Sequence, residues 1–319
     1  MSELAIKTNG VYESINPLVT VVTCVYNRAD KIHRVFDSMK LQTYDCFEHV
    51  IVDDGSDDNI DEKVYEYMKS VPFPVKYIKK ENGGKHTATN TAWANSRGKY
   101  VVNLDSDDGF VPHAVEYMVK LWDEIPEKDR HLYWCVQARC FDHGTGKMIG
   151  ARYPDNINRL SDKELEKELS KVYGDKTGLQ VLEKVRDVGF EEPEGVKFVS
   201  EGTVWRVLNK KYKTYYSNEM VKEVYFDEHG RISNESMSKQ TVRNRLYNNW
   251  YLTEHSKDIK NSFNGNVVYF LRFGLYYWRA DREFKKMHKF RLSNVFKQLA
   301  FWLLTPLFLI KVSREPKPE

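Results

Sequence analysis

Apolar runs and amphipathic segments alternate along the first 125 residues of this 319-residue chain. Continuous β-rich apolar runs predict strands, and apolar residues spaced three or four apart predict helices with one buried face. The predicted strands cover residues 18–26, 47–52, 75–78 and 100–104, and the predicted helices cover residues 29–41, 60–68, 85–96 and a segment that starts at Pro112. This alternation predicts an α/β fold with a mainly parallel central sheet that helices flank on both faces.

Local signals refine this picture and extend it past residue 125. Asn27 followed by Asp30 resembles a helix-start signal, so we expect the first helix to begin just after the first strand. Further along, the pattern predicts strands over residues 131–138, 212–216 and 221–226 and a charged surface helix over residues 160–169. We therefore divide the chain into residues 1–125, a mixed segment 126–262, and a basic, aromatic, helical C-terminal segment 263–319.

Composition is that of an ordinary globular protein, with 41% hydrophobic and 30% charged residues. The net charge of +3 is uneven, because residues 271–319 carry 11 Lys and Arg against 4 Asp and Glu. Four cysteines are too few and too irregularly spaced for a disulfide scaffold or a zinc site. No signal peptide precedes the first apolar run, so we expect the protein in the cytoplasm.

Polar residues follow each of the first four predicted strands. These loops are Tyr26-Asn27-Arg28, Asp53-Asp54-Gly55-Ser56, Asn82-Gly83-Gly84-Lys85-His86 and Asp105-Ser106-Asp107-Asp108. In open parallel sheets, ligands bind beyond the carboxyl ends of the strands, so we expect the four loops to share one crevice.

The loop at residues 105–108 carries three carboxylates in four positions directly after an apolar strand. Like charges this close repel, so one should take up a proton unless a cation is present. A hard divalent cation such as Mg²⁺ or Mn²⁺ would supply that charge and is often shared with substrate phosphates. The alternative is a solvated acidic turn.

The other loops allow nucleotide chemistry, although each is also a common turn. Asp53 or Asp54 could accept hydrogen bonds from a base edge or a ribose hydroxyl. The loop at residues 82–85 leads into a predicted helix, whose free N–H groups attract phosphate. Neither G-x-G-x-x-G nor G-x-x-x-x-G-K-[ST] occurs, which argues against a dinucleotide-dependent dehydrogenase and a P-loop enzyme.

Four motifs in this order resemble the family 2 glycosyltransferases, which have the Rossmann-like GT-A fold. The resemblance covers roughly Pro17 to Trp122 and rests on Val21-Val22-Thr23-Cys24-Val25-Tyr26-Asn27-Arg28, Ile51-Val52-Asp53-Asp54-Gly55-Ser56-Asp57-Asp58, Asn82-Gly83-Gly84-Lys85-His86-Thr87-Ala88-Thr89-Asn90 and Leu104-Asp105-Ser106-Asp107-Asp108. Each motif is weak alone, and the four in sequence are specific.

The resemblance implies a role for each motif in binding a nucleotide sugar. The nucleoside pocket would be lined by Thr23, Cys24, Tyr26, Asp53 and Asp54, with Asp54 reading the uracil or ribose. Asn82 and Lys85 would lie along the diphosphate and sugar. Asp105, Ser106 and Asp107 correspond to the DxD motif, with Asp105 nearer the ribose and Asp107 as the main ligand of Mn²⁺ or Mg²⁺.

The resemblance also implies a general base in the second half of the chain. Many inverting members carry a Glu-Asp pair there, and this chain has Glu201 followed by Gly202. Glu201 is therefore the candidate base, and a helix-capping or salt-bridged glutamate is the alternative. The sequence also departs from the family at Thr89-Asn90, where Arg-Asn is more usual.

These features predict a metal-dependent, inverting glycosyltransferase that moves a sugar from a UDP-sugar to a glycan or lipid-linked glycan in cell-surface polysaccharide synthesis. A nucleotidyltransferase is one alternative, although it would show a Gly-rich basic loop after the first strand. The other alternative is a catalytically silent module that binds a nucleotide sugar. No feature of the sequence indicates a nucleic-acid partner.

The C-terminal segment contains an almost entirely apolar run at residues 299–310, bracketed by Lys297 and Lys311. Twelve residues span about 18 Å as a helix, too little to cross a bilayer. Pro306 would kink such a helix. Together with the basic, aromatic residues before it, the run predicts a helix that lies on the inner face of the membrane. The alternative is a helix packed on the protein core.

Overall fold

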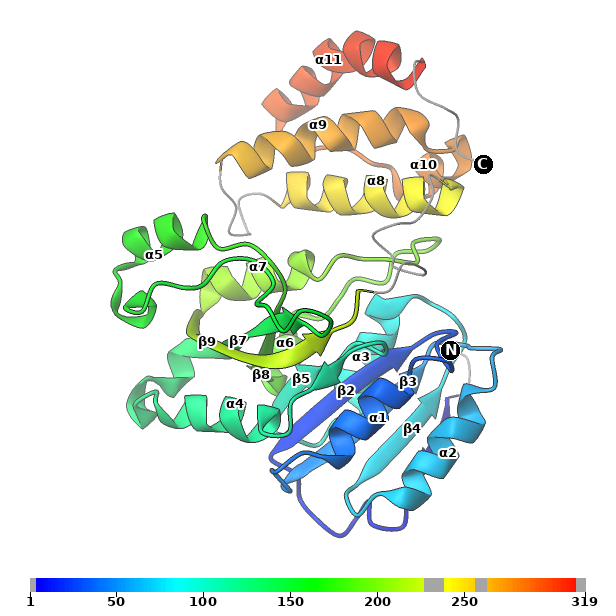
Figure 1. Cartoon of the computed structure of the whole chain (residues 1–319). Helices are drawn as coiled ribbons and strands as arrows, with labels where there is room; N and C mark the ends of the chain where they lie inside the picture. The colour runs from blue at the N-terminus through cyan, green and yellow to red at the C-terminus, as the bar shows by residue number, and fades with distance from the viewer. Residues whose placement is uncertain (1–3, 227–237, 256–262, 314–319) are drawn as a thin grey trace. The chain divides into compact units, whose positions relative to one another are not determined.

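The structure is a computed structural model that describes residues 4–226, 238–255 and 263–313 (Figure 1). These residues form two compact units. Unit 1 comprises residues 4–82, 88–187 and 212–226, and unit 2 comprises residues 83–87, 188–211, 238–255 and 263–313. The chain passes between the units several times, so the compact units do not follow the boundaries at residues 125 and 262. The functional halves assigned from sequence stay predictions.

Unit 1 is built on one mixed sheet, which has nine strands among the described residues, in the order β1-β4-β3-β2-β5-β8-β7-β9-β6. The strands are β1 (Ala5–Thr8), β2 (Val19–Val25), β3 (Phe47–Asp53), β4 (Val75–Lys79), β5 (Tyr100–Asn103), β6 (Gly109–Phe110), β7 (Tyr133–Asp142), β8 (Lys176–Val181) and β9 (Lys213–Val224). The neighbours β4, β3, β2 and β5 are parallel, as are β7 and β9, and the other pairings are antiparallel.

The helices of the N-terminal part connect these strands. They are α1 (His33–Lys40), α2 (Ile60–Ser70), α3 (Lys85–Ala94), α4 (Ala114–Asp123), α5 (Asp162–Leu169) and α6 (Leu182–Val188), with short 3₁₀ helices at Glu127–Leu132 and Ile157–Arg159. The predicted strands and helices up to α4 are thus confirmed in type and order. The parallel sheet is confirmed for β4, β3, β2 and β5, whereas the rest of the sheet is mixed.

Several expectations about element ends are wrong. The first helix begins at His33 rather than at residue 29, and Asn27 does not cap it. Asn27 has a left-handed φ of 49°, and its side-chain oxygen accepts a hydrogen bond from the Asp57 N–H group. The strands predicted over residues 212–216 and 221–226 form one strand, β9, and β1 and β8 lack a clear sequence signal.

The two faces of the parallel strands serve different purposes. Val19, Val21 and Val25 of β2 point to one face, where α1, α2 and α4 contribute the buried apolar side chains of the main core. The intervening Cys24 points to the opposite face, where its Sγ lies 3.6 Å from the Thr89 Oγ1 of α3. Helices therefore cover both faces, as the α/β pattern requires.

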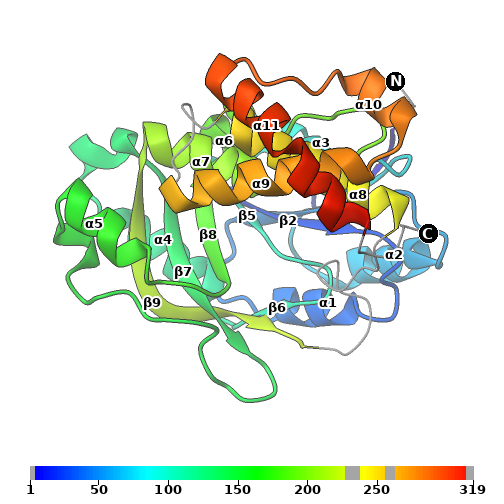
Figure 2. The same ribbon diagram turned by 90° about the horizontal axis from the view of Figure 1, so that it is seen from above.

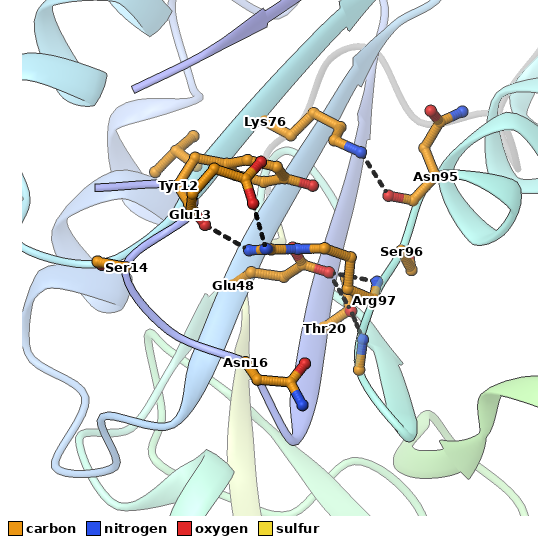
Figure 3. A network of polar contacts seen from close by, with 12 residues as sticks. Tyr12, Glu13, Ser14, Asn16, Thr20, Glu48, Lys76, Asn95, Ser96 and Arg97 are labelled. Atoms are coloured by element: carbon orange, nitrogen blue, oxygen red, sulfur yellow. Dashed lines mark hydrogen bonds and ion pairs between the residues drawn. The ribbon is translucent and has the colours of Figure 1, made fainter. Parts of the chain in front are cut away.

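A buried ion pair fixes the loops at the start of the parallel strands (Figure 3). The Glu48 carboxylate of β3 is fully buried and lies 2.9 Å from the Arg97 Nε. Thr20 donates a hydrogen bond to Glu48, and Arg97 donates one to the Tyr12 carbonyl and stacks on the Tyr12 ring. Breaking this pair would leave the buried charge of Glu48 uncompensated. The network therefore fixes the position of the residues that lead into β2 and β5.

A long excursion leaves the sheet after β7 and returns at β8. Its two arms cross at Gly150 and Gly174, where a Cβ on either glycine would lie 2.1 or 2.2 Å from a carbonyl oxygen of the other arm. The buried Arg139 of β7 donates from Nη2 to the carbonyls of Ile149 and Tyr173, one on each arm. Arg139 therefore closes the base of the excursion, which carries α5.

Unit 2 is helical. Its helices are α7 (Gly202–Lys211), α8 (Lys239–Glu254), α9 (Phe263–Arg279), α10 (Arg282–His288) and α11 (Val295–Ser313). Helix α9 packs on α8, and α11 crosses over α9 (Figures 1 and 2), where Phe301 stacks against Phe273 and Tyr277. Pro306 lies inside α11. Among the described residues, no helix combines the length and the apolar character that a membrane span requires.

The buried imidazole of His49 makes stability depend on pH. Its ring nitrogens lie 3.0 Å from the Tyr67 hydroxyl and 3.0 Å from the Thr23 hydroxyl. Burial lowers the pKa of His49 from its ordinary value to about 3. Because the folded pKa is below the unfolded one, His49 contributes fully above pH 6.5, and this contribution is lost as the pH falls towards 3.

We therefore expect the free energy of unfolding to drop by about 2 kcal/mol between pH 7 and pH 5 through His49. The variant His49→Gln lacks the ionisable ring, so its stability should fall less over the same interval. Urea unfolding of both proteins at the two pH values measures the difference. Parallel pH dependences would contradict the assignment.

Candidate active site

The carboxyl ends of β4, β3, β2 and β5 lie at one edge of unit 1, and each leads into a polar loop. This is the edge at which open α/β sheets bind their ligands. The loops after β2, β3 and β4 are tied to one another, and the loop after β5 carries the acidic turn.

Asp53, at the end of β3, is engaged by the protein itself. The Ser56 N–H group donates to its Oδ1 at 2.8 Å, and the Tyr77 hydroxyl donates to its Oδ2 at 3.0 Å. The side chain is fully buried, with Lys79 3.4 Å away. Asp53 thus shapes the turn after β3, a role that its assignment as a ligand-binding residue did not include.

Asp54 and Asn82 are brought together as predicted. The Asn82 side-chain amide donates to the Asp54 carboxylate at 3.2 Å and to the Asp54 carbonyl at 3.0 Å. Lys80 lies 2.7 Å from the other Asp54 oxygen. Gly55 permits this approach, because it has a φ of 82° and a Cβ there would lie 2.8 Å from the Asn82 nitrogen.

The end of β2 separates three of the five residues predicted to line the nucleoside pocket. Tyr26 is 49% exposed, and Cys24 faces α3. Thr23 lies on the other face, fully buried beside His49. The Thr23 side chain therefore points into the core, because neighbouring residues of a strand point to opposite faces, and its assignment to the nucleoside pocket stays a prediction.

The acidic turn after β5 contains an internal cation that sequence reasoning missed. Lys222 of β9 places its Nζ 2.5 Å from Asp105 Oδ2 and 2.8 Å from Asp108 Oδ2. Burial opposes the charged form of Lys222, but Asp105 and Asp108 raise its pKa well above the ordinary value. Burial raises the pKa of Asp108 to about 6, against the opposing attraction of Lys222.

Asp107 differs from its two neighbours in this turn. Among the described residues, no hydrogen bond or ion pair engages its half-buried carboxylate. Its backbone carbonyl accepts a hydrogen bond from Arg34 of α1 at 3.2 Å. Ser106 is also half-buried. Lys222 therefore engages the buried carboxylate of Asp108 and the partly exposed carboxylate of Asp105, and the Asp107 carboxylate is available for a ligand.

Lys222 changes the expectation that these carboxylates need a divalent cation or a proton. The protein supplies one positive charge from a strand more than a hundred residues away. The sequence carries no signal for this role, because a lysine next to an apolar residue in a predicted strand is expected on a solvent-exposed face. No cluster of three or more His, Cys, Asp or Glu residues suited to a metal ion occurs in the described ranges.

The candidate base lies in unit 2, as does Lys85. Glu201 directly precedes α7, and its carboxylate lies 3.1 Å from the Lys85 Nζ. Both side chains are partly exposed, at 35% for Lys85 and 44% for Glu201. The structure thus pairs two residues to which the sequence assigned separate roles.

The segment before Glu201 is held by the protein backbone and by α8. Asn244 accepts a hydrogen bond from the Lys197 N–H group, and Asn248 accepts one from the Ser200 N–H group. Gly84 packs so closely here that a Cβ on it would lie 1.9 Å from the Lys197 carbonyl oxygen. Glu201 is therefore presented from a fixed segment.

Comparison with known proteins identifies a protein family that matches this chain. A sequence model of the family described as glycosyl transferase family 2 matches residues 20–178. An uncharacterized glycosyltransferase of Rickettsia felis is 35% identical over 117 residues, which are 37% of this chain and 19% of that protein. The chain therefore matches about a fifth of that relative's length.

Solved structures support the predicted GT-A fold. Staphylococcus aureus TarS in complex with UDP-GlcNAc superposes with a TM-score of 0.53 and 16% identity, covering 93% of this chain and 89% of that chain. The mannosyltransferase PcManGT from Pyrobaculum calidifontis, in complex with GDP-Man and Mn²⁺, gives 0.54 and 19%, covering 94% and 87%. At these identities the likeness shows the fold alone.

A pair of glycine variants tests the contact between the loops after β3 and β4. Gly55→Ala should destabilise the protein by at least about 2 kcal/mol, because its Cβ meets the Asn82 backbone. Gly146→Ala is the control, since Gly146 also has a positive φ but has nothing within 4 Å of a Cβ. Its cost should be about 1 kcal/mol, from the left-handed backbone alone. Equal losses in urea unfolding would contradict the contact.

Proposed function

The chain belongs to glycosyl transferase family 2 through residues 20–178, and from this premise we propose that it is a metal-dependent, inverting glycosyltransferase. It moves a sugar from a UDP-sugar to a hydroxyl of a glycan or lipid-linked glycan in cell-surface polysaccharide synthesis. The observation that carries the proposal is the Asp107 carboxylate, which has no partner within the described part of the chain and follows β5 at the ligand-binding edge of the sheet.

The loops after β2, β3 and β4 support a nucleoside site. Asp54 is held in place by Lys80 and Asn82 and offers hydrogen-bond acceptors for a uracil or ribose. Tyr26 is exposed beside them and offers an aromatic face. The complex of TarS with UDP-GlcNAc shows that a protein with this fold binds a UDP-sugar, which supports the same donor class here.

The residues fit a divalent cation that shares its ligands with a substrate. Mg²⁺ and Mn²⁺ at phosphate sites commonly use one or two carboxylates, with phosphate oxygens and water as the remaining ligands. Asp107 offers one carboxylate, and Asp105 has one oxygen beside Lys222. Asp107 would hold the ion, with Asp105 as a weaker second candidate. A bound ion would neutralise charge on the departing diphosphate.

The protein's own residues account for the remaining steps. Asp54 and Asn82 orient the nucleotide, and Lys85 contributes a positive charge for the diphosphate or sugar. In an inverting transfer the acceptor hydroxyl attacks the anomeric carbon opposite the leaving diphosphate, while a base takes its proton. Glu201 is the candidate base. Its ion pair with Lys85 holds the carboxylate at the start of α7.

One observation favours a catalytically silent nucleotide-sugar module as the second candidate. Glu201 is already paired with Lys85, and Gly202 stands where many inverting relatives have an aspartate. Such a module would bind a UDP-sugar without transferring the sugar. A nucleotidyltransferase would instead release pyrophosphate from a nucleoside triphosphate.

Release of UDP from a panel of UDP-sugars with Mn²⁺ tests the enzymatic proposal. Asp107→Asn should lower turnover at least about 100-fold, because it removes a charged ligand near the leaving group. Asp37→Asn is a matched control on the exposed surface of α1 and should retain turnover. Binding of a UDP-sugar without turnover in the wild type would favour the silent module, and turnover persisting in Asp107→Asn would refute the metal ligand.

The helices of unit 2 support peripheral attachment to the inner, cytoplasmic face of a membrane. On α11, Phe296, Leu299, Leu303 and Leu307 recur at helical spacing and are between 56% and 83% exposed. The opposite side of α11 contributes the buried Phe301. The preceding segment supplies cations, namely Arg279, Arg282, Lys285, Lys286, Lys289 and Arg291. An apolar face beside clustered cations suits a bilayer with anionic headgroups.

The double variant Phe296→Ser and Leu303→Ser should weaken binding to anionic vesicles at least about tenfold, because two large apolar side chains no longer enter the bilayer. Leu41→Ser with Leu132→Ser is the control, since these leucines are also exposed but lie in unit 1. Vesicle co-sedimentation measures the affinity. Equal binding by the wild type and both double variants would contradict the membrane surface.

A further inference from the structure

Three carboxylates and one ammonium group meet at the turn after β5. Carboxylate oxygens of Asp105 and Asp108 lie within 2.8 Å of the Lys222 Nζ, whereas no hydrogen bond or ion pair engages the Asp107 carboxylate within the residues that the structure describes. Lys222 is close to fully buried, with a side-chain exposure of 8%. Its charge is therefore a permanent part of the turn, because a buried ammonium held by two carboxylates cannot move into water without leaving both unpaired.

The sheet fixes Lys222 in this position. Phe110 of β6, two residues beyond Asp108, is paired with Lys222 in the antiparallel register of β6 and β9. The Val111 N–H group donates to the Val221 carbonyl at 3.1 Å. On its other side, β9 pairs Lys222 with Cys140 of β7. Backbone hydrogen bonds on both sides of β9 thus place the ammonium beneath the turn.

We propose that Lys222 is a positioning residue that acts as a built-in counter-cation, so that Asp107 takes a divalent cation only together with a nucleotide diphosphate. The proposal rests on the function proposed above. Lys222 engages the carboxylates of Asp105 and Asp108 and leaves that of Asp107 for an incoming ion. A single carboxylate holds Mg²⁺ or Mn²⁺ weakly, and the phosphate oxygens of the donor supply the missing ligands.

The charge balance of the turn also predicts weak binding of a divalent cation in the absence of nucleotide. Without Lys222 the turn would present three negative charges, and a divalent cation would be their strongest available partner. The ammonium cancels one of these charges at short range, where screening by water is weak because the group is buried. Lys222 therefore competes with a metal ion for the same carboxylates.

Binding of Mn²⁺ in the absence of nucleotide tests this role directly, by the loss of the electron paramagnetic resonance signal of free Mn²⁺. Lys222→Met should bind Mn²⁺ at least tenfold more tightly than the wild type, since Asp105 and Asp108 lose their internal cation. Lys222→Arg keeps the charge and should bind Mn²⁺ like the wild type. A merely structural lysine predicts the opposite, namely affinity that is unchanged or lower in Lys222→Met, and that result would overturn the proposal.

Two further measurements keep the test decisive if Lys222→Met does not fold. Lys222→Gln retains an amide that can donate to the carboxylates but has no charge, and it should also bind Mn²⁺ more tightly. In the wild type, the melting temperature should rise more with Mn²⁺ and UDP together than the sum of the two separate shifts. A full shift with Mn²⁺ alone would refute the coupling.

These readouts separate the inference from the proposed function, because none of them measures sugar transfer. If the metal behaves as described but no UDP-sugar is turned over, the enzymatic proposal fails and the role of Lys222 stands. If UDP-sugars are turned over and Lys222→Gln binds Mn²⁺ no more tightly than the wild type, the role of Lys222 fails and the enzymatic proposal stands.

Discussion

The ammonium group of Lys222 between the carboxylates of Asp105 and Asp108 is the interaction on which the candidate ligand-binding edge of the sheet depends. It balances charge that the turn itself concentrates, and it does so from a strand far away in the sequence. Because Lys222 and Asp108 are buried, their ion pair fixes the arrangement of the turn, and the Asp107 carboxylate is the one that Lys222 does not engage. The candidate chemistry of this edge thus follows from a charge balance made inside the protein before any ligand binds.

Successive side chains along β2 and β3 point to opposite faces of the sheet, and the two faces have different neighbours. Thr23 and His49 join the apolar core on one face, while Cys24 meets α3 on the other. At the strand ends the same division separates Asp53, which holds its own turn, from Asp54, which is tied to Asn82 in the neighbouring loop. Neighbouring residues of one motif therefore have different structural roles. The motif alone does not show which residue holds its own turn or the core and which contacts a neighbouring loop or helix.

The sequence predicts what local periodicity and strand-end chemistry determine. The first four parallel strands, the helices between them and the meeting of Asp54 with Asn82 follow from apolar runs and from the edge at which parallel strands end. The sequence does not predict the ion-pair partners of Asp105 and Glu201, because these partners, Lys222 and Lys85, lie over a hundred residues away along the chain. Strands β1 and β8 are missed for a related reason, since their pairing partners define them more than their own residues do.

The crossing of Gly150 and Gly174, closed by Arg139, brings the two ends of the excursion between β7 and β8 together. Within the excursion, Tyr153 and Asn158 are hydrogen-bonded to Asn218 and Tyr216 of β9, so its first part is tied to the sheet. Helix α5, by contrast, has no buried side chain. Changes in sequence or length should therefore be tolerated best at α5 and least at the crossing, where a side chain on either glycine would meet a carbonyl oxygen.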